Sequence, residues 1–396
     1  MTASTPRPSG PDPLDLLAVD ELLTEEERMV QQTVRAFAAD RIRPHLADWF
    51  EQGVFPAREL APELGRLGLL GMHLDGYGCA GAGAVAYGVA CLELEAADSG
   101  LRSFVSVQGS LAMRAIHAFG SEEQKQRWLP GMAAGELIGC FGLTEPDFGS
   151  DPGNMRTTAR RKGGDWVLSG AKMWITNGSI ADVAVVWAQT EDGVRGFLVE
   201  RGAAGFTATD VHGKLSLRAS VTSELHFDEV LLPADAVLPG VTGLRGPLSC
   251  LNEARYGILW GTVGAARDCY AAALEYAKTR IQFGRPIAAF QLTQQKLVEM
   301  ALELEKAHLA AWRIGRLKEE GRARAAHISF GKLNNVRTAL EIARSARTVL
   351  GANGITTAYP VLRHANNLES VLTYEGTSEI HTLVLGEAIT GESAYR

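Results

Sequence analysis

The chain changes character at Phe141-Gly142-Leu143-Thr144-Glu145-Pro146-Asp147-Phe148-Gly149-Ser150-Asp151. Before this segment apolar residues recur at helical spacing, and after it short apolar runs alternate with turn residues. The segment holds two glycines and two hydroxyl side chains, so its backbone can approach a large ligand closely and donate hydrogen bonds to it. A plain interdomain turn is the alternative, and the segment alone does not decide between the two.

On its N-terminal side, from Thr24 to about Ala134, the pattern predicts helices. Thr24-Glu25-Glu26-Glu27 is a capping box, in which a hydroxyl and a carboxylate satisfy backbone amides at a helix start. Ser121-Glu122-Glu123-Gln124 is a second one. Between them, three further helices are predicted over residues 56–67, 85–97 and 103–119.

On its C-terminal side, the pattern predicts strands at 166–168, 184–188, 196–199 and 225–227. No long helix interrupts them, and parallel strands need long crossovers, so we expect an antiparallel β domain. From about Pro247 to the end, helical spacing returns. The predicted organisation is α+β and multi-domain: a flexible tail (1–15), an N-terminal helical domain (16–136), a middle β domain (137–240) and a C-terminal helical bundle (241–396).

Composition excludes several classes of partner. The net charge of −7 argues against nucleic acid or an anionic membrane. No apolar run approaches the ~20 residues that span a bilayer. The five cysteines are scattered, without the spacing of a zinc site or a disulfide framework, so no metal is expected. The N-terminus has neither the Arg-rich pattern of a transit peptide nor an apolar signal stretch, which favours a cytoplasmic location.

One motif points elsewhere. Gly76-Tyr77-Gly78-Cys79-Ala80-Gly81 matches the dinucleotide-binding pattern G-x-G-x-x-G and precedes a predicted helix. That pattern requires a strand–helix–strand unit, whereas residues 103–119 are predicted to be helical. We therefore interpret the motif as a glycine-rich loop between helices.

Two further segments can carry chemistry. In Lys172-Met173-Trp174-Ile175-Thr176-Asn177-Gly178, an aromatic and a hydroxyl at a strand end could cover a flat ring system, or the Trp could simply be packed. In the segment 370–381, Glu375 lies between two predicted helices, next to Gly376. A desolvated carboxylate there would have a raised pKa and could take a proton from carbon, whereas a solvated helix-end Glu could not.

These three motifs, in this order, resemble the acyl-CoA dehydrogenase family, and within it the glutaryl-CoA dehydrogenase branch. The similarity extends from about residue 22 to residue 391 and includes the segments 76–81, 250–257 and 363–369. It implies an N-terminal helical domain, a middle antiparallel β-barrel-like domain and a C-terminal four-helix bundle.

The resemblance implies FAD as the cofactor. Its predicted contacts in the 141–150 loop and the following strand are Phe141, Leu143, Thr144, Gly149, Ser150, Trp174, Ile175 and Thr176. Contacts after the base are Thr377, Ser378, Glu379 and Tyr395. Positions that reach a neighbouring subunit's FAD in the family are Arg280, Phe283, Gln291, Thr348, Leu350 and Gly351. A shared cofactor implies a homo-oligomer, usually a tetramer.

The resemblance also implies a reaction. Glu375 removes the α-proton of an acyl-CoA, the β-hydrogen leaves as hydride to the flavin, and the Glu375 backbone N–H helps to stabilise the enolate. Arg102 matches the arginine that binds the distal carboxylate of glutaryl-CoA, and Glu95 matches a carboxylate near it. Tyr374 is typical of members that decarboxylate to crotonyl-CoA and CO2. The other predicted substrate contacts are Ser103, Ser150, Leu248, Asn252, Arg255 and Gly376.

Electron-transferring flavoprotein is the acceptor that the resemblance implies. Leu101 departs from the pattern, since close relatives often have Tyr there, and this leaves the shape of the pocket open. The alternatives are a dehydrogenase of a neutral short- or branched-chain acyl-CoA, a non-decarboxylating glutaryl-CoA dehydrogenase, a flavin monooxygenase or oxidase on the same scaffold, and a non-catalytic helical binding protein.

Overall fold

The computed structural model describes residues 10–395; residues 1–9 and 396 lie outside the described part. The predicted flexible tail (1–15) therefore falls partly outside it, and Leu14 and Asp15, within the described part, contact residues further along the chain. The Asp15 carboxylate accepts hydrogen bonds from the Val19 and Asp20 amides at 2.7 and 3.0 Å. Leu14 packs against the main hydrophobic core.

The N-terminal domain is helical, as predicted. Its helices are α1 (Glu25–Phe37), α2 (Leu46–Gln52), α3 (Ala57–Arg66), α4 (Ala84–Ala97), α5 (Ser99–Ser106), α6 (Arg114–Phe119) and α7 (Glu122–Ala133). Both predicted capping boxes are present, at Thr24 and Ser121. The predicted helix 103–119 begins earlier, at Ser99, and contains a wider π-helical turn over Val107–Met113. The glycine-rich motif 76–81 lies in the connection between α3 and α4, as expected for a loop between helices.

The middle domain is a curled sheet with the strands β1 (Gly139–Gly142), β2 (Thr158–Lys162), β3 (Asp165–Thr176), β4 (Val183–Thr190), β5 (Gly193–Glu200), β6 (Phe206–Asp210) and β7 (Thr222–Leu232). The strand order is β1-β4-β2-β3-β7-β6, and β5 pairs with β4. Most pairs are antiparallel, as predicted, but β1 pairs with β4 in parallel, and so does β2 at one residue pair. The segment 141–151 thus begins inside a strand and becomes a loop only after Gly142.

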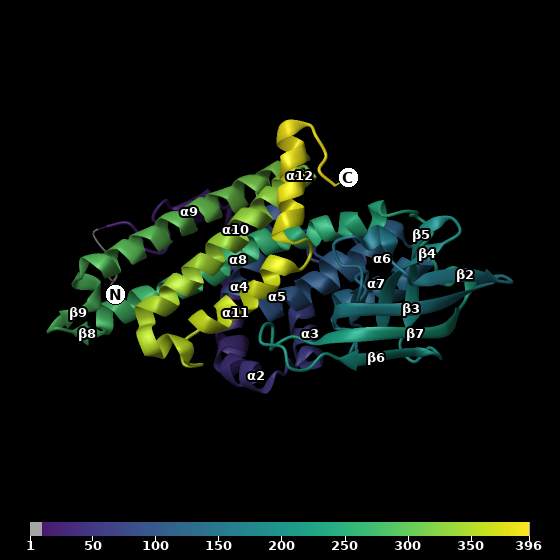
Figure 1. Cartoon of the computed structure of the whole chain (residues 1–396), viewed down its shortest axis with the longest axis horizontal. Coiled ribbons are helices and arrows are strands. Elements are labelled where there is room, and N and C mark those ends of the chain that lie inside the picture. Colours follow the sequence, from purple (N-terminus) through teal and green to yellow (C-terminus); the bar gives the residue numbers. More distant parts are fainter. Residues whose placement is uncertain (1–9, 396) are drawn as a thin grey trace.

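Five helices make the C-terminal domain: α8 (Arg245–Thr279), α9 (Gln291–Glu319), α10 (Ala325–Leu350), α11 (Val361–Thr373) and α12 (Ser378–Thr390). A short hairpin of β8 (Ile281–Gln282) and β9 (Arg285–Pro286) joins α8 to α9. Figure 1 shows α8 running along the molecule, with this hairpin at one end and the sheet at the other. No helix within residues 10–395 is both long and apolar enough to cross a membrane.

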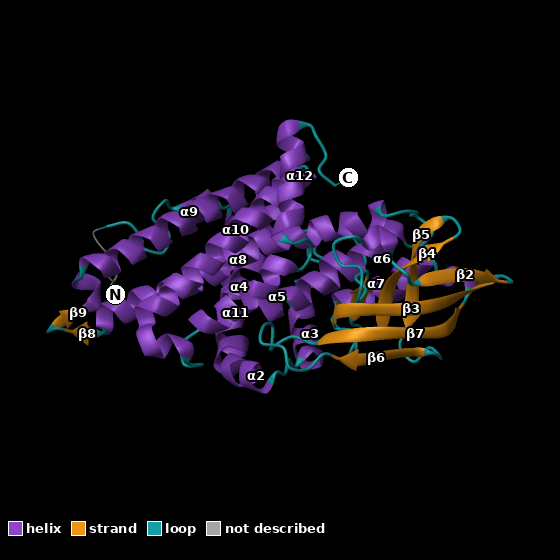
Figure 2. Cartoon of the chain, viewed as in Figure 1, coloured by secondary structure: helices purple, strands orange, loops and turns teal. Residues whose placement is uncertain are grey.

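The two helical domains share one core, to which α4, α8, α9 and α10 all contribute buried side chains. Helices α4 and α8 are in close contact at Gly264. A Cβ at this position would lie 1.9 Å from the Leu92 carbonyl oxygen, so only glycine fits. Figure 2 shows the helices packed together, with the sheet beside them. A core shared in this way holds α4, α5, α8 and α10 in a fixed relative arrangement.

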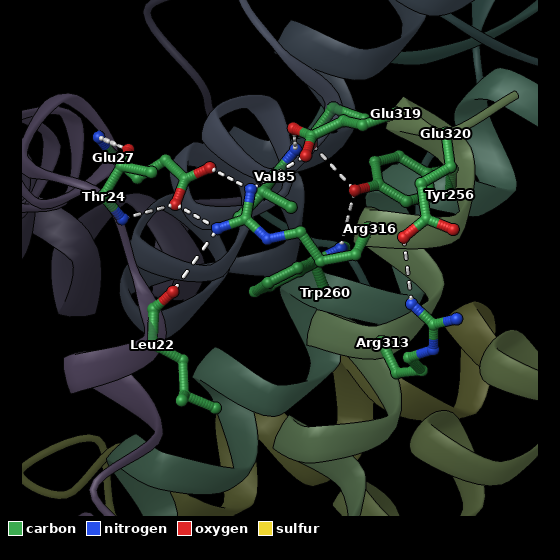
Figure 3. Close-up of polar contacts among 11 residues, drawn as sticks. Leu22, Thr24, Glu27, Val85, Tyr256, Trp260, Arg313, Arg316, Glu319 and Glu320 are labelled. Carbon is green, nitrogen blue, oxygen red and sulfur yellow. Dashed lines mark hydrogen bonds and ion pairs between the residues drawn. The ribbon is translucent and has the colours of Figure 1, made fainter.

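Arg316 on α9 forms ion pairs that link the start of the N-terminal domain to the C-terminal bundle. Its guanidinium donates to both Glu27 carboxylate oxygens, each at 2.7 Å, and also bonds Glu319 (Figure 3). Glu27 in turn accepts from the Thr24 amide, which links this ion pair to the first capping box. The beginning of α1 is therefore held by both local and long-range contacts.

Candidate active site

The segment after α11 has an unusual backbone. Glu375 has a φ of +53° and Gly376 a φ of +98°, after which the Thr377 hydroxyl caps α12 by accepting from the Ile380 amide. A left-handed conformation at a non-glycine residue costs of the order of 1–3 kcal/mol and persists only when its surroundings impose it. The chain thus turns sharply at the predicted base, as the Glu-Gly pair indicated.

The Glu375 side chain is half-buried, with one carboxyl oxygen inside the protein. Its Oε2 is buried and has no hydrogen-bond partner among the described residues. Burial raises the pKa of the Glu375 carboxyl, although the positive charges of Arg102, Lys332 and Arg255 act in the opposite direction. A carboxylate with a raised pKa is a stronger base, which is what removal of a proton from carbon requires.

A buried ion pair from α4 and α5 forms a second part of the site. Asp98 ends α4 and caps α5 by accepting from the Gly100 amide at 2.7 Å. That turn brings Arg102 back alongside Glu95, and the Arg102 Nε donates to Glu95 at 2.7 Å. The Arg102 Nη2 donates to the Tyr374 hydroxyl, which also lies 3.2 Å from the Ser103 hydroxyl.

Arg102 has an unsatisfied donor in a fully buried place. Its side chain is 0% exposed, and its Nη1 has no partner among the described residues. Burial alone would lower the pKa of Arg102, but the Glu95 carboxylate raises it well above its usual range, so the guanidinium stays charged. A buried N–H of a charged group without an acceptor is costly, which indicates that an anionic or polar ligand group belongs there.

The first turns of α8 lie against the same segment. The Arg255 Nε donates to the Glu375 carbonyl at 2.6 Å, and its Nη1 donates to the Asn252 side chain at 3.3 Å. Leu248, at the start of the helix, is partly exposed. The structure therefore places Arg255 beside the base, and its predicted contact with CoA stays a prediction.

The loop after β1 is held from beneath by a buried lysine. Lys172 donates to the Leu143 carbonyl at 3.0 Å and to the Glu145 carboxylate at 2.9 Å. Glu145 also accepts from the Arg156 and Thr157 amides. Ser150, by contrast, is exposed, as is Gly149. The loop is thus rigid at its base and open at its surface.

The end of β3 presents an exposed aromatic side chain. Trp174 is 59% exposed and has a φ of +63°, within a register shift of the β3–β7 pairing between Lys172 and Ile175. Ile175 is buried and anchors the strand below it. A strained backbone that turns an indole outward, next to the Thr176 hydroxyl, fits a flat ring ligand better than the packed Trp that was the alternative.

Within one chain, the predicted cofactor residues lie in two separate places. Thr377, Ser378 and Glu379 begin α12 next to the base, and the Tyr395 hydroxyl donates to the Ile380 carbonyl at 3.4 Å. Other predicted contacts lie at the opposite end of the bundle from β3, at the β8–β9 hairpin and the end of α10 (Figure 1), namely Arg280, Phe283, Gln291, Thr348, Leu350 and Gly351. Phe283 is 94% exposed. This separation is what a contact with a neighbouring subunit's cofactor requires.

Two residues beside the base were missed by sequence reasoning. Lys332 on α10 donates to the Tyr374 and Gly376 carbonyls, and His381 on α12 lies within hydrogen-bonding distance of Ser329 at 3.0 Å. Lys332 lies four residues after Ile328 and four before Val336, both buried, so it interrupts an otherwise buried stripe. A charged residue at such a position was the available signal.

Comparison with known proteins agrees with this arrangement. Three family models match: acyl-CoA dehydrogenase, N-terminal domain (residues 24–136), middle domain (140–230) and C-terminal domain (242–390). The chain is 38% identical to the mitochondrial short-chain specific acyl-CoA dehydrogenase of Homo sapiens over 371 residues, 92% of this chain and 90% of that protein.

Two solved structures from Mycobacterium smegmatis are similar throughout. A glutaryl-CoA dehydrogenase is 65% identical with a TM-score of 0.96, over 98% of this chain and 100% of that one. A glutaryl-CoA dehydrogenase in complex with FADH2 is 60% identical, with the same TM-score and coverage. They support the glutaryl-CoA branch of the resemblance. With a half-buried glutamate between α11 and α12, a β domain and three matching domain models, the chain belongs to the acyl-CoA dehydrogenase family.

Proposed function

We propose that the protein oxidises glutaryl-CoA between its α- and β-carbons and decarboxylates the product to crotonyl-CoA and CO2. Its activity as an acyl-CoA dehydrogenase follows from the family. The dicarboxylic substrate is the finer claim, and one observation carries it. Arg102 is fully buried, charged and left with an unpartnered Nη1 beside Tyr374.

This guanidinium suits a carboxylate at the far end of an acyl chain. Glu95 occupies its Nε, which leaves the Nη1–Nη2 side to meet a planar anion. The Tyr374 and Ser103 hydroxyls lie on that side and can also donate. A neutral acyl chain would leave the buried Nη1 without an acceptor, so the site disfavours it.

Glu375 performs the proton chemistry. Its raised pKa suits it to accept the α-proton, and its buried Oε2 has no other hydrogen-bond partner among the described residues. Removal of the α-proton builds charge on the thioester oxygen. The Glu375 backbone N–H, which has no acceptor within residues 10–395, can donate to that oxygen.

The cofactor is FAD, which supplies the acceptor for the hydride from the β-carbon. The residues that would hold it are the 141–150 loop, which is exposed at Gly149 and Ser150, and the segment 174–176, in which Trp174 is exposed. The FADH2 complex of the Mycobacterium smegmatis relative supports this assignment.

Decarboxylation follows from the electronic structure of the oxidised substrate. The new double bond connects the γ-carbon to the thioester, so the electrons of the C–CO2 bond can move toward the thioester oxygen as CO2 leaves. The resulting enolate then needs a proton at the γ-carbon, and the protonated Glu375 carboxyl is an acid in the same site. Tyr374, bonded to Arg102, would keep the carboxylate oriented until the bond breaks.

Assembly and electron transfer complete the proposal. A homotetramer would place the exposed Phe283 and its neighbours at another subunit's cofactor, and the partner that reoxidises the enzyme would be an electron-transferring flavoprotein. A 94% exposed phenylalanine at a hairpin tip supports burial in an assembly.

Product analysis tests the function directly. The purified enzyme with FAD and an artificial electron acceptor is expected to turn glutaryl-CoA into crotonyl-CoA and one equivalent of CO2. Glutaconyl-CoA without CO2 would refute decarboxylation. The similarity to the human short-chain enzyme favours butyryl-CoA as the second candidate; turnover of butyryl-CoA as fast as that of glutaryl-CoA would refute the dicarboxylic substrate.

A further inference from the structure

Two cations hold three consecutive carbonyls around the base. The Lys332 ammonium donates to the Tyr374 carbonyl at 2.8 Å and to the Gly376 carbonyl at 2.6 Å. The Arg255 guanidinium takes the carbonyl between them, that of Glu375, at 2.6 Å. Lys332 is only 1% exposed. Burial lowers the pKa of Lys332 to about 7, whereas the Glu375 carboxylate acts in the opposite direction, and in the charged form the two carbonyls bond the ammonium.

The direction of these carbonyls decides the direction of the neighbouring amides. The peptide bonds here are trans, so each N–H points opposite to the carbonyl that precedes it. The Glu375 N–H therefore points away from Lys332, and the Gly376 N–H points away from Arg255. Within residues 10–395, neither amide has a protein acceptor. Both donors are thus left available at the segment that carries the base.

We propose that Lys332 is a positioning residue for proton abstraction: it holds the left-handed turn at Glu375 and orients and polarises the 374–375 peptide, whose N–H stabilises the enolate. The inference rests on the proposed function, since it needs Glu375 to act as the base. A carbonyl that accepts a charged hydrogen bond makes the N–H of the same peptide a better donor, because bonds in a chain polarise one another. A buried site strengthens this effect.

Lys332 also acts on the Glu375 carboxyl. The other titratable or charged groups near this carboxyl are Tyr374, the residue before it, and groups from three further elements: Glu95 on α4, Arg102 on α5 and Arg255 on α8. His381 on α12 lies against the backbone at Gly376. Burial lowers the pKa of His381 to about 3, so this ring is neutral at pH 7. Lys332 is one of the three cations that lower the Glu375 pKa, so its removal would raise that pKa further.

The test replaces Lys332 by Met in the FAD-loaded enzyme and uses acetoacetyl-CoA as the probe. The α-carbon of this thioester is acidic enough to ionise without catalysis, so the ultraviolet absorbance of its bound enolate reports the pKa of the ligand itself. We expect this ligand pKa to rise by about one unit or more in Lys332→Met. We expect kcat to fall roughly 10- to 100-fold, less than the 10²–10³-fold loss on removal of a direct oxyanion donor. The acidic limb of the kcat/KM profile should move to higher pH.

Lys214 offers a matched control. Its ammonium also donates to two carbonyls, those of Leu217 at 2.9 Å and Ser220 at 2.7 Å, and Leu217 has a left-handed φ of +49°. This lysine lies in the β6–β7 connection, outside the site. Lys214→Met should lower the melting temperature but leave the pKa of the bound acetoacetyl-CoA unchanged.

Conservative variants keep the test decisive if Lys332→Met does not fold. Lys332→Arg keeps the charge and the donors, so the ligand pKa should lie closer to the wild-type value than in Lys332→Met. Lys332→Gln keeps a neutral NH2 donor and should lie between Lys332→Met and Lys332→Arg. A wild-type ligand pKa in folded Lys332→Met or Lys332→Gln, or an equal shift in Lys214→Met, would overturn the inference. The proposed substrate fails separately, in the wild type, if butyryl-CoA is turned over as fast as glutaryl-CoA; the Lys332 series is then measured with butyryl-CoA, whose oxidation also begins at the α-proton.

Discussion

Replacement of the buried Glu95–Arg102 pair is the sharpest test of the proposed substrate. Arg102→Met alone would leave Glu95, which is 0% exposed, without its cation, at a cost of about 3–5 kcal/mol in folding free energy. The double variant Glu95→Gln/Arg102→Met removes both charges and still offers the Ser99 hydroxyl an acceptor at position 95. Loss of activity in this variant then reports on substrate recognition rather than on an unpaired buried charge.

The expected magnitude follows from the burial of Arg102. Truncating one partner of a buried, hydrogen-bonded charge pair costs about 2–5 kcal/mol in binding. Since each 1.4 kcal/mol is a factor of ten, kcat/KM for glutaryl-CoA should fall by between about 30-fold and about 4,000-fold. Butyryl-CoA has no carboxylate for Arg102, so its kcat/KM should change less than about tenfold and could rise, because a methionine replaces an unsatisfied guanidinium.

The assay is kcat/KM for the two substrates with an artificial electron acceptor. Glu93→Gln/Arg267→Met is the control, because Glu93 lies on the same helix, is buried and pairs with Arg267 at 2.7 Å away from the site. It should lower the melting temperature while keeping the ratio of the two substrates. Equal losses on both substrates in the Glu95/Arg102 variant would refute the role of Arg102, and so would a control with the same change in ratio.

Three further outcomes are expected. Glu375→Gln should still bind FAD and ligand but lose at least about 10²-fold in kcat, since an amide cannot accept the proton. In the wild type, kcat/KM should rise with pH through the raised pKa of Glu375. A kcat/KM profile that rises at or below the ordinary carboxyl range would contradict the burial argument. Trp174→Ala should change the melting temperature little because the indole is exposed, yet weaken FAD binding roughly 2- to 10-fold by the loss of an aromatic contact, measured by titration of the apoprotein. Gly376→Ala should cost about 1–3 kcal/mol of stability and lower kcat, because the φ of Gly376 is +98°. The added methyl group would also lie 2.9 Å from the His381 Nε2 and 3.2 Å from the Arg255 Nη2. Unchanged kinetics would show that the turn tolerates displacement.

In the middle domain, sequence patterns predict some strands but not how the strands pair. The strands around 184–188 and 196–199 were predicted because β-branched and aromatic runs lie between turn residues. β1 was not, since its four residues are all buried and show no alternation. Its parallel pairing with β4 joins residues about forty positions apart, and no local signal encodes that partner.

Local sequence by itself determined the helix starts at Thr24 and Ser121, the break at Glu375-Gly376 and the division into helical, β and helical parts. Capping, periodicity and turn formation depend on neighbours within a few residues, so they can be read along the chain. Only the tertiary structure decided that Arg102 is buried against Tyr374, 272 positions away, and that Lys332 donates to the carbonyls on either side of Glu375. Desolvation and charge at the site arise where distant helices pack together, and they set the pKa of Glu375.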